Sequence, residues 1–330
     1  MLVDEFVFLS NWIGRDFNLV QGSGGNVSVK IQDNLMLVKA SGVSLSSVGL
    51  NSGYCSVQLC PRDRSSKSSG PFFLSSDDTS LRPSLETSFH ALLDWRFVAH
   101  VHPSSLMPAL CSDLSQLRRL IAGCGYKVEV VEYIKPGIEL ALAINKLICR
   151  NGLAQVYLLR NHGVIVGADR GAEVIDLIGS IVSFGARRRF NSEVELGESV
   201  GEKRTSGMME VQNDLVRSLA LDDISYDIAI NSRCMFSPDQ AVFLYDVLTQ
   251  NAEEFLNDSR FDAAIIKGQG VFVRPDRSWQ FIQNLKAYAD VLTYMPRNYE
   301  MLARLSDTQI RELVTWDAEI YRKELRGHTC

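Results

Sequence analysis

A mixed α/β fold is predicted for this chain by three properties of its sequence. Segments with apolar residues at helical spacing and segments that alternate with period two are interleaved along the chain. The length of 330 residues corresponds to about two domains, or one large one. Hydrophobic residues make up 46% and charged residues 22% of the chain, so enough apolar side chains are present for a large core.

The N-terminal part begins with a predicted helix and continues with strands. Residues 2–12 carry apolar side chains at helical spacing, and a glycine-rich turn follows at 22–26. Residues 27–31 alternate with period two and are expected to form a hairpin with 35–38. Residues 62–83 are rich in Ser, Asp and Arg, which predicts a long surface loop around one short strand.

Helices and strands alternate in the middle of the chain. The elements that periodicity predicts there are helices over 86–95, 137–150 and 171–189, and strands over 97–101, 128–133, 156–160 and 164–166. Asn161-His162-Gly163 would form the turn between the last two strands. The arginine run 187–189 is expected on the solvated surface, because cations are favoured at a helix C-terminus.

A polar stretch and an internal similarity suggest how the chain divides. Residues 191–210 are poor in large apolar side chains and are expected to be a linker or an exposed excursion, and we predict domains over 1–195 and 196–330. The segment 158–170 resembles 265–277, with His162 matched by Gln269, which is a poor zinc ligand. One explanation of this similarity is that strand-turn-strand-helix segments look alike in general. The other is that the C-terminal α/β extension is a degenerate repeat of the fold unit that lacks its metal-binding chemistry.

Charge and composition exclude several classes of protein. The net charge is −5 and no basic stripe is visible, which argues against nucleic-acid binding. No segment approaches the ~20 apolar residues of a membrane helix, and the acidic N-terminus has the wrong sign for a secretory signal. The seven cysteines form no CxxC motif and have irregular spacing, so we expect reduced thiols and a cytoplasmic protein.

Three of the five histidines can be combined into a metal site. His100 and His102 flank one residue of a predicted strand, and positions two apart point to the same face. A catalytic zinc ion takes three protein ligands and keeps an open position, and His162 could supply the third. Taken singly, the pair could be accidental and His162 an ordinary turn residue.

Other residues could complete such a site. Glu86 lies four residues before His90 on a predicted helix, where it could be a helix-start carboxylate or a proton carrier beside the metal. His90 lies in an amphipathic run and is expected to be structural. The glycine turn 22–28, Ser41-Gly42 and Ser84 could form an anion pocket, although such turns are commonly only turns.

In this order, these motifs resemble the class II aldolase/adducin family over roughly residues 1–190. The similar segments are Gly-Ser-Gly-Gly-Asn-Val-Ser at 22–28, Lys-Ala-Ser-Gly at 39–42, Pro-Ser-x-Glu-x-x-x-His at 83–90, His-x-His-Pro at 100–103 and Asn-His-Gly at 161–163. The chain most resembles aldolase domains that are fused to short-chain dehydrogenases in bifunctional rhamnulose-phosphate aldolases. The dehydrogenase half is not present in this sequence.

The resemblance implies a three-layer αβα fold with a central, mainly antiparallel sheet and helices on both faces. It also implies a zinc-dependent aldolase that cleaves a ketose 1-phosphate, or a related hydroxy-ketone, through an enediolate. Residue by residue, the implied roles are zinc ligands at His100, His102 and His162, catalysis by Glu86 and Tyr133, and phosphate binding by Ser23, Asn26, Ser41, Gly42 and Ser84. In the family's fuculose-phosphate aldolases the tyrosine comes from a neighbouring subunit, which implies a homo-oligomer, with a tetramer favoured. Alternatively, Tyr133 is an ordinary buried tyrosine at the end of a strand.

One departure and two alternatives stay open. The family's paired serines before the glutamate become Ser84-Leu85, which removes a hydroxyl from the phosphate pocket. A sugar-phosphate 4-epimerase on the same scaffold would carry aspartate in place of Glu86. A non-catalytic, adducin-like interaction module would have lost metal ligands, whereas all three histidines are present here.

Overall fold

The computed structural model describes two compact units, Met1–Gly185 and Ala186–Cys330. The residues described are 1–60, 72–75, 81–189, 204–205, 207–231, 234–276 and 279–317. The domain boundary predicted at 195/196 falls outside them.

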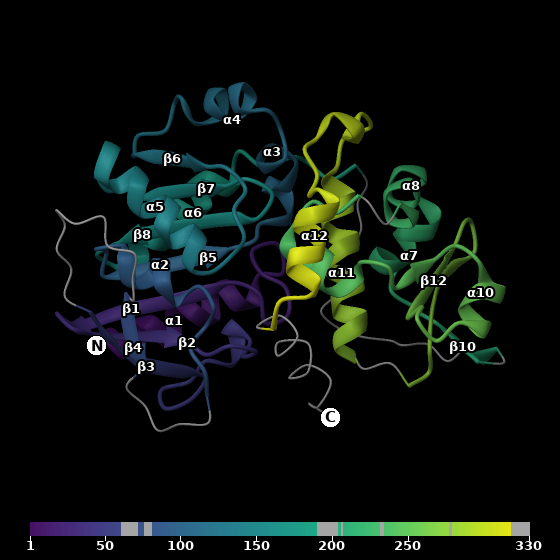
Figure 1. Cartoon of the computed structure of the whole chain (residues 1–330), viewed down its shortest axis with the longest axis horizontal. Helices are drawn as coiled ribbons and strands as arrows, with labels where there is room; N and C mark the ends of the chain where they lie inside the picture. The colour runs from purple at the N-terminus through teal and green to yellow at the C-terminus, as the bar shows by residue number, and fades with distance from the viewer. Residues whose placement is uncertain are drawn as a thin grey trace. The chain divides into compact units, whose positions relative to one another are not determined.

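The first unit is built on an eight-stranded sheet with the order β4-β3-β2-β1-β5-β8-β7-β6 (Figure 1). Its strands are β1 (Asn26–Gln32), β2 (Leu35–Lys39), β3 (Tyr54–Leu59), β4 (Phe73–Ser75), β5 (Phe97–Val101), β6 (Val128–Val131), β7 (Val156–Leu159) and β8 (Gly163–Ala168). Neighbouring strands run antiparallel except β6 and β7, which are parallel. The predicted, mainly antiparallel sheet is confirmed.

Alternation along the strands gives this sheet two apolar faces. Phe97, Ala99 and Val101 of β5 belong to one core, together with residues of α1 (Leu2–Arg15) and α6 (Gly171–Val182). Val98 belongs to the other core, with residues of α2 (Thr87–Leu92) and α5 (Ile138–Asn151). Helices therefore cover both faces, and the three-layer αβα fold is confirmed. Position 100 shares its face with Val98, on the side of α2.

Shorter elements complete the first unit. They are the 3₁₀ turns Leu45–Ser47 and Ser104–Leu106 and the helices α3 (Met107–Leu110) and α4 (Leu114–Ile121). The helix predicted over 171–189 ends at Val182, where the chain turns and the Gly185 N–H donates to the Val182 carbonyl (2.8 Å). Strand β3 was not predicted, although Cys55, Val57 and Leu59 alternate with polar residues along it.

The second unit contains a five-stranded sheet with the order β11-β12-β13-β10-β9. Its strands are β9 (Arg204–Thr205), β10 (Met208–Glu210), β11 (Leu248–Thr249), β12 (Ala263–Ile266) and β13 (Gly270–Val273). Its helices are α7 (Asp214–Leu221), α8 (Asp223–Ile230), α9 (Pro238–Leu244), α10 (Ala252–Asn257), α11 (Trp279–Tyr294) and α12 (Asp307–Val314), with a 3₁₀ turn at Tyr299–Met301. In Figure 1 this unit is coloured green to yellow.

Arg187 is exposed, as the sequence predicts for the arginine run, but Arg188 and Arg189 are half-buried and paired. Arg188 forms an ion pair with Asp290, which is fully buried in α11, and donates to the Tyr294 hydroxyl (2.8 Å). Arg189 forms an ion pair with Asp222, and its backbone N–H donates to the Thr293 carbonyl (2.9 Å). Both guanidinium groups therefore tie the start of the second unit to its own helices.

The expected linker over 191–210 is partly corrected. Residues 190–203 and 206 lie outside the described part of the chain, as do 61–71 and 76–80 of the expected loop. The described residues 204–205 and 208–210 pair as the antiparallel strands β9 and β10 rather than forming a linker. None of the described helices is long and apolar enough to cross a membrane.

Candidate metal centre and active site

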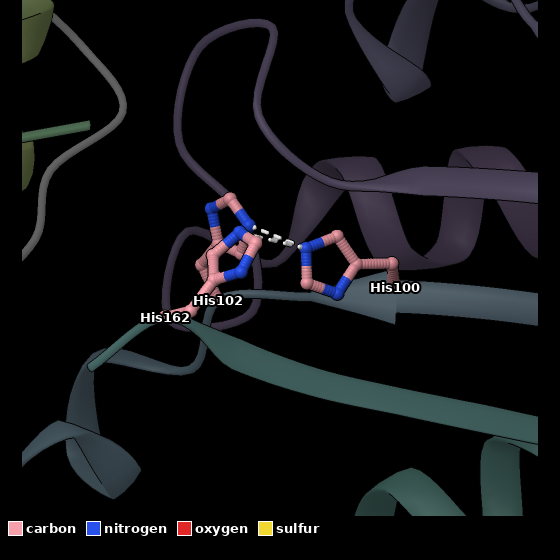
Figure 2. A group of neighbouring side chains, drawn as sticks. All are labelled: His100, His102 and His162. Carbon is pink, nitrogen blue, oxygen red and sulfur yellow. Dashed lines mark hydrogen bonds between the residues drawn. The ribbon is translucent and has the colours of Figure 1, made fainter. Parts of the chain in front are cut away.

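Three histidine side chains meet at one end of the eight-stranded sheet (Figure 2). His100 is the fourth residue of β5, His102 follows that strand, and His162 lies in the turn between β7 and β8. The Nε2 atom of His100 lies 2.9 Å from Nε2 of His102 and 3.3 Å from Nε2 of His162. The structure thus brings together the three histidines that the sequence singles out.

The backbone of β8 orients the central imidazole. The Nδ1 atom of His100 lies 3.0 Å from the carbonyl oxygen of Val164. A carbonyl only accepts, so Nδ1 carries the hydrogen and the lone pair is on Nε2, toward the other two rings. Metal-bound histidines are oriented by the same kind of hydrogen bond.

The donor set fits a divalent metal ion. Zinc binds imidazole nitrogen at ~2.0–2.1 Å, so two nitrogens at the corners of a tetrahedron lie about 3.3 Å apart. The Nε2 separations of His100 from His102 and His162 lie near this value, and all three ligand atoms lie within 4.8 Å of one another. His100 is fully buried and His162 nearly so, which restricts solvent competition.

Glu86 adds a carboxylate to the same point. It is the residue before α2, and its Oε1 atom lies 3.2 Å from Nε2 of His100 and 3.4 Å from Nε2 of His162. Burial raises the pKa of the Glu86 carboxyl. In the metal-free protein, where Nε2 of His100 can carry a proton instead of a metal ion, the hydrogen bond from His100 and the positive charges of protonated His100, His162 and His102 outweigh burial. The net effect is a pKa well below the usual value, so the carboxylate is ionised at neutral pH.

The turn that presents His162 depends on an unusual residue. Asn161 has a positive φ of 53°, which asparagine tolerates better than most residues. Its backbone N–H donates to the Leu110 carbonyl (3.3 Å), and its Nδ2 donates to Sγ of Cys111 (3.3 Å). Burial raises the pKa of Cys111 far above its usual value, so this thiol remains protonated and serves packing.

The residues predicted to bind phosphate lie on neighbouring turns at this end of the sheet. Ser23 and Asn26 precede or begin β1, and Asn26 lies opposite His100 in the β1–β5 ladder. Ser41 and Gly42 follow β2, and the Ser41 N–H donates to the Arg82 carbonyl (2.8 Å) just before Ser84. These turns therefore adjoin the histidines, although the structure leaves their roles untested.

Sequence reasoning missed one residue that joins these turns. Lys39, at the end of β2, is 2% exposed, and its Nζ atom donates to the carbonyls of Ser23 (3.0 Å) and Val43 (2.7 Å). A lysine at a buried position requires such hydrogen bonds. The available signal was a cation that ends the apolar run Leu35-Met36-Leu37-Val38.

Tyr133 and His90 are the two remaining residues that the sequence singles out, the first as a catalytic residue and the second as a structural one. Tyr133 lies two residues beyond β6, whose Val131 pairs with Leu159, so it is at the same end of the sheet as the His162 turn. Its half-buried ring does not decide between the catalytic and structural interpretations. His90 is fully buried, with Nδ1 2.8 Å from the Ser28 hydroxyl, which confirms the structural interpretation.

Comparisons with known proteins extend this description. The chain is 28% identical over 225 residues to a protein named "Uncharacterized oxidoreductase YuxG" from Bacillus subtilis; the match covers 63% of the chain and 32% of that relative, about a third of its length. The N-terminal class II aldolase domain of a Thermoplasma acidophilum protein is 28% identical, with a TM-score of 0.45, covering 55% of this chain and 91% of that one. A sugar-phosphate aldolase from Thermotoga maritima is 17% identical, with a TM-score of 0.44, covering 56% and 91%.

The family assignment rests on a match over more than half of the sequence. Residues 5–182 match the family described as the class II aldolase and adducin N-terminal domain. This range contains the three histidines, Glu86 and the turns around Lys39, so the match includes the whole candidate site. The chain belongs to the class II aldolase and adducin family.

Proposed function

We propose that the protein is a zinc-dependent aldolase, a lyase that cleaves a ketose 1-phosphate or a related hydroxy-ketone. The observation that carries the proposal is the convergence of three imidazole Nε2 atoms and one carboxylate oxygen on one point. Family membership supports a lyase in general terms. A non-catalytic member that had lost its metal would not need to keep four such groups together.

His100, His102 and His162 would hold the metal ion, leaving a position for substrate oxygen. Bound zinc supplies a Lewis acid that withdraws electrons from the substrate carbonyl. Glu86 is placed to move the proton: its Oε1 atom is adjacent to the ligands, and its side chain is only 13% exposed. An ionised carboxylate in this position accepts a proton from the substrate and returns it to the carbon released by bond cleavage.

Asn26 supports an anionic or hydroxylated substrate beside the metal. Its side chain is fully buried, and within the described part of the chain neither its Oδ1 nor its Nδ2 has a hydrogen-bond partner. A buried amide without partners is costly, so a ligand that pairs with it would recover that energy. Ser23, Ser41, Gly42 and Ser84 are the remaining phosphate-binding residues in this proposal, and Lys39 adds a positive charge.

The function is tested by screening ketose 1-phosphates and non-phosphorylated hydroxy-ketones for aldehyde release, with and without a chelator. We expect aldehyde from at least one compound, loss of activity with the chelator and recovery with added zinc. Interconversion of 4-epimers without aldehyde release would indicate an epimerase. Absence of bound metal in the purified protein would instead favour an interaction module.

The assembly and cellular location are part of the proposal. We propose a cytoplasmic homo-oligomer, with a tetramer favoured, in which Tyr133 of one subunit acts on the aldehyde oxygen at a neighbouring site. YuxG is named an oxidoreductase and is much longer than the matched region.

A further inference from the structure

The second unit repeats the strand arrangement of the first. In the first unit the strands β1, β5, β6, β7 and β8 form the sheet order β1-β5-β8-β7-β6. In the second unit β9 to β13 form the order β9-β10-β13-β12-β11. The pairs β6–β7 and β11–β12 are parallel, and the other corresponding pairs are antiparallel. The two sheets therefore agree in strand direction as well as in order.

The register of the central hairpin is also the same. Leu159 lies opposite Gly163, and Ile266 lies opposite Gly270, 107 residues further along in both cases. All four residue pairs of β7 with β8 correspond, with this one shift, to the four pairs of β12 with β13. Within a regular antiparallel hairpin one pair determines the others, so this agreement is a single observation: the two hairpins have the same turn length at the same offset in the sequence.

The turns of these hairpins have a hydrogen bond in common. The His162 N–H donates to the Leu159 carbonyl (3.2 Å), and the Gln269 N–H donates to the Ile266 carbonyl (3.0 Å). Both bonds close the turn at the same positions. Gln269 is therefore the counterpart of His162 in backbone geometry as well as in the sequence pattern.

The strand beside the hairpin gives a second counterpart. His100 of β5 lies opposite Ile165, and Glu210 of β10 lies opposite Phe272. Phe272 is 107 residues after Ile165, so Glu210 occupies the ladder position of His100. Gln212 lies two residues after Glu210, beyond the end of β10, just as His102 lies two residues after His100, beyond the end of β5.

A hydrogen bond outside the sheets agrees with this alignment. The Asn161 N–H donates to the Leu110 carbonyl (3.3 Å), and the Gly268 N–H donates to the Ala220 carbonyl (2.9 Å). The donors are again 107 residues apart. The acceptors Leu110 and Ala220 lie ten residues after His100 and Glu210, respectively. Leu110 is the last residue of α3 in the first unit, and Ala220 lies in α7 of the second unit. The helix after the strand is thus part of the repeat.

We infer that the second unit is a copy of the metal-binding sheet in which the metal centre has been replaced. The three ligand positions hold Glu210 in place of His100, Gln212 in place of His102 and Gln269 in place of His162. Two amides and one carboxylate are a poor donor set for zinc. The cation near Glu210 is the Arg217 guanidinium, whose Nε lies 3.8 Å from Oε1. Within the described residues the chain therefore contains two copies of the framework, and one of them carries the three-histidine cluster.

A second difference removes the proton carrier. In the first unit, residues 33–96 separate β1 from β5 and include α2 with Glu86. In the second unit only residues 206 and 207 separate β9 from β10, which leaves no space in the chain for such a helix. The copy thus lacks both the histidine ligands and the counterpart of Glu86, the proposed general base.

The inference is tested by restoring a metal centre at these positions. The native site is first removed by His102→Ala and His162→Ala, so that the result does not depend on the proposed function. Gln212→His and Gln269→His are then added, which with native Glu210 makes a two-histidine, one-carboxylate site. Gln269 is exposed and Gln212 half-buried, so the changes fall on tolerant positions. We expect about one Co²⁺ per chain by elemental analysis, with visible absorption.

The matched control moves one histidine out of register. In the same background, Gln212→His with Lys267→His should bind Co²⁺ at least about tenfold more weakly, because the third ligand is misplaced. Equal affinities in two folded variants, shown by circular dichroism, would overturn the inference. If the first variant does not fold, Gln212→Cys with Gln269→Cys replaces it. We then expect thiolate-to-Co²⁺ charge-transfer absorption, and its absence from the folded cysteine variant would also overturn the inference.

Discussion

Gly163 approaches the Val101 carbonyl oxygen so closely that a Cβ atom at position 163 would lie 2.5 Å from it. The same Cβ would lie 2.8 Å from the His102 ring and 3.1 Å from the His100 ring. The absence of a side chain at this residue therefore allows the His162 turn to pack against the other two histidines. The glycine of the Asn-His-Gly motif is required because there is no room for a side chain at this position, and not because the backbone needs a positive φ.

Gly163→Ala is expected to lower stability by about 1–3 kcal/mol, because backbone atoms cannot move aside cheaply. It should also weaken metal binding, since the displaced turn carries His162. Urea unfolding and metal titration measure the two effects. Gly179→Ala in α6 is the control: nothing lies within 4 Å of its added Cβ, and alanine favours the helix. Equal effects of the two substitutions would contradict this account.

His102→Ala should release the metal. We expect about one zinc ion per chain in the native protein, and loss of one of three protein ligands should leave far less than full occupancy after dialysis. Elemental analysis of both proteins measures this. His328→Ala, near the C-terminus of the sequence, is the control and should keep the native zinc content. Full zinc occupancy in the His102 variant would show that this residue is not a ligand.

Glu86→Gln should keep the fold and the metal but lose turnover. The amide has the shape of the carboxylate without its basicity, and general acid–base groups typically contribute ~10²–10⁴-fold. Initial rates at matched zinc occupancy provide the measurement. Glu5→Gln, remote in sequence and bonded to the Gly171 N–H, is a charge-matched control expected to keep the native rate. A near-native rate for Glu86→Gln would rule out its proposed role.

The Tyr133 proposal predicts complementation between subunits. Tyr133→Phe and Glu86→Gln chains, each inactive alone, should regain partial activity when they assemble together, because some sites then contain both intact groups. Sedimentation should first show an oligomer at micromolar concentration. No recovery in verified mixed oligomers would mean that each chain completes its own site, or that Tyr133 has no catalytic part.

His90 predicts a pH dependence of folding. Burial is the main cause that lowers the pKa of its imidazole well below the usual value for histidine. The unfolded chain binds a proton near pH 6.5 that the folded chain does not, so acid favours unfolding. In metal-free protein, stability should fall more steeply from pH 7 to 5 for the native chain than for His90→Gln. Parallel urea-unfolding results for the two proteins would exclude this linkage.

The sequence predicted the central strands of the first unit because each is a short apolar run that ends at polar residues or glycine. The spacing of His100 and His102 determines that they share a face, and this needs no tertiary information. The meeting of His162 with them depends on strands β5 and β8 being neighbours, which came only from the family resemblance. The arginine run shows the opposite case: the partners of Arg188 and Arg189, Asp290 and Asp222, are distant in the sequence, so local reasoning placed both in solvent.

Lys39 and the ends of helices were beyond the reach of sequence reasoning for physical reasons. A buried lysine is recognisable only when its hydrogen-bond acceptors are known, and here they are backbone carbonyls of two turns. The end of α6 at Val182 depends on the close packing of Gly185 against Ser105, where a Cβ would lie 2.6 Å from the hydroxyl. The cytoplasmic location stays a prediction.

The segment between β1 and β5 carries one part of the candidate site, and the three histidines come from other parts of the chain. Residues 33–96 contribute Glu86, Ser84 and the Ser41-Gly42 turn, whereas the histidines come from β5 and the β7–β8 turn. In the second unit the corresponding strands β9 and β10 pair directly, without such an insertion. Under the proposed function, the metal ligands and the proton carrier therefore come from different stretches of the chain, so we expect substitutions of Glu86 or Ser84 to change reactivity more than metal affinity.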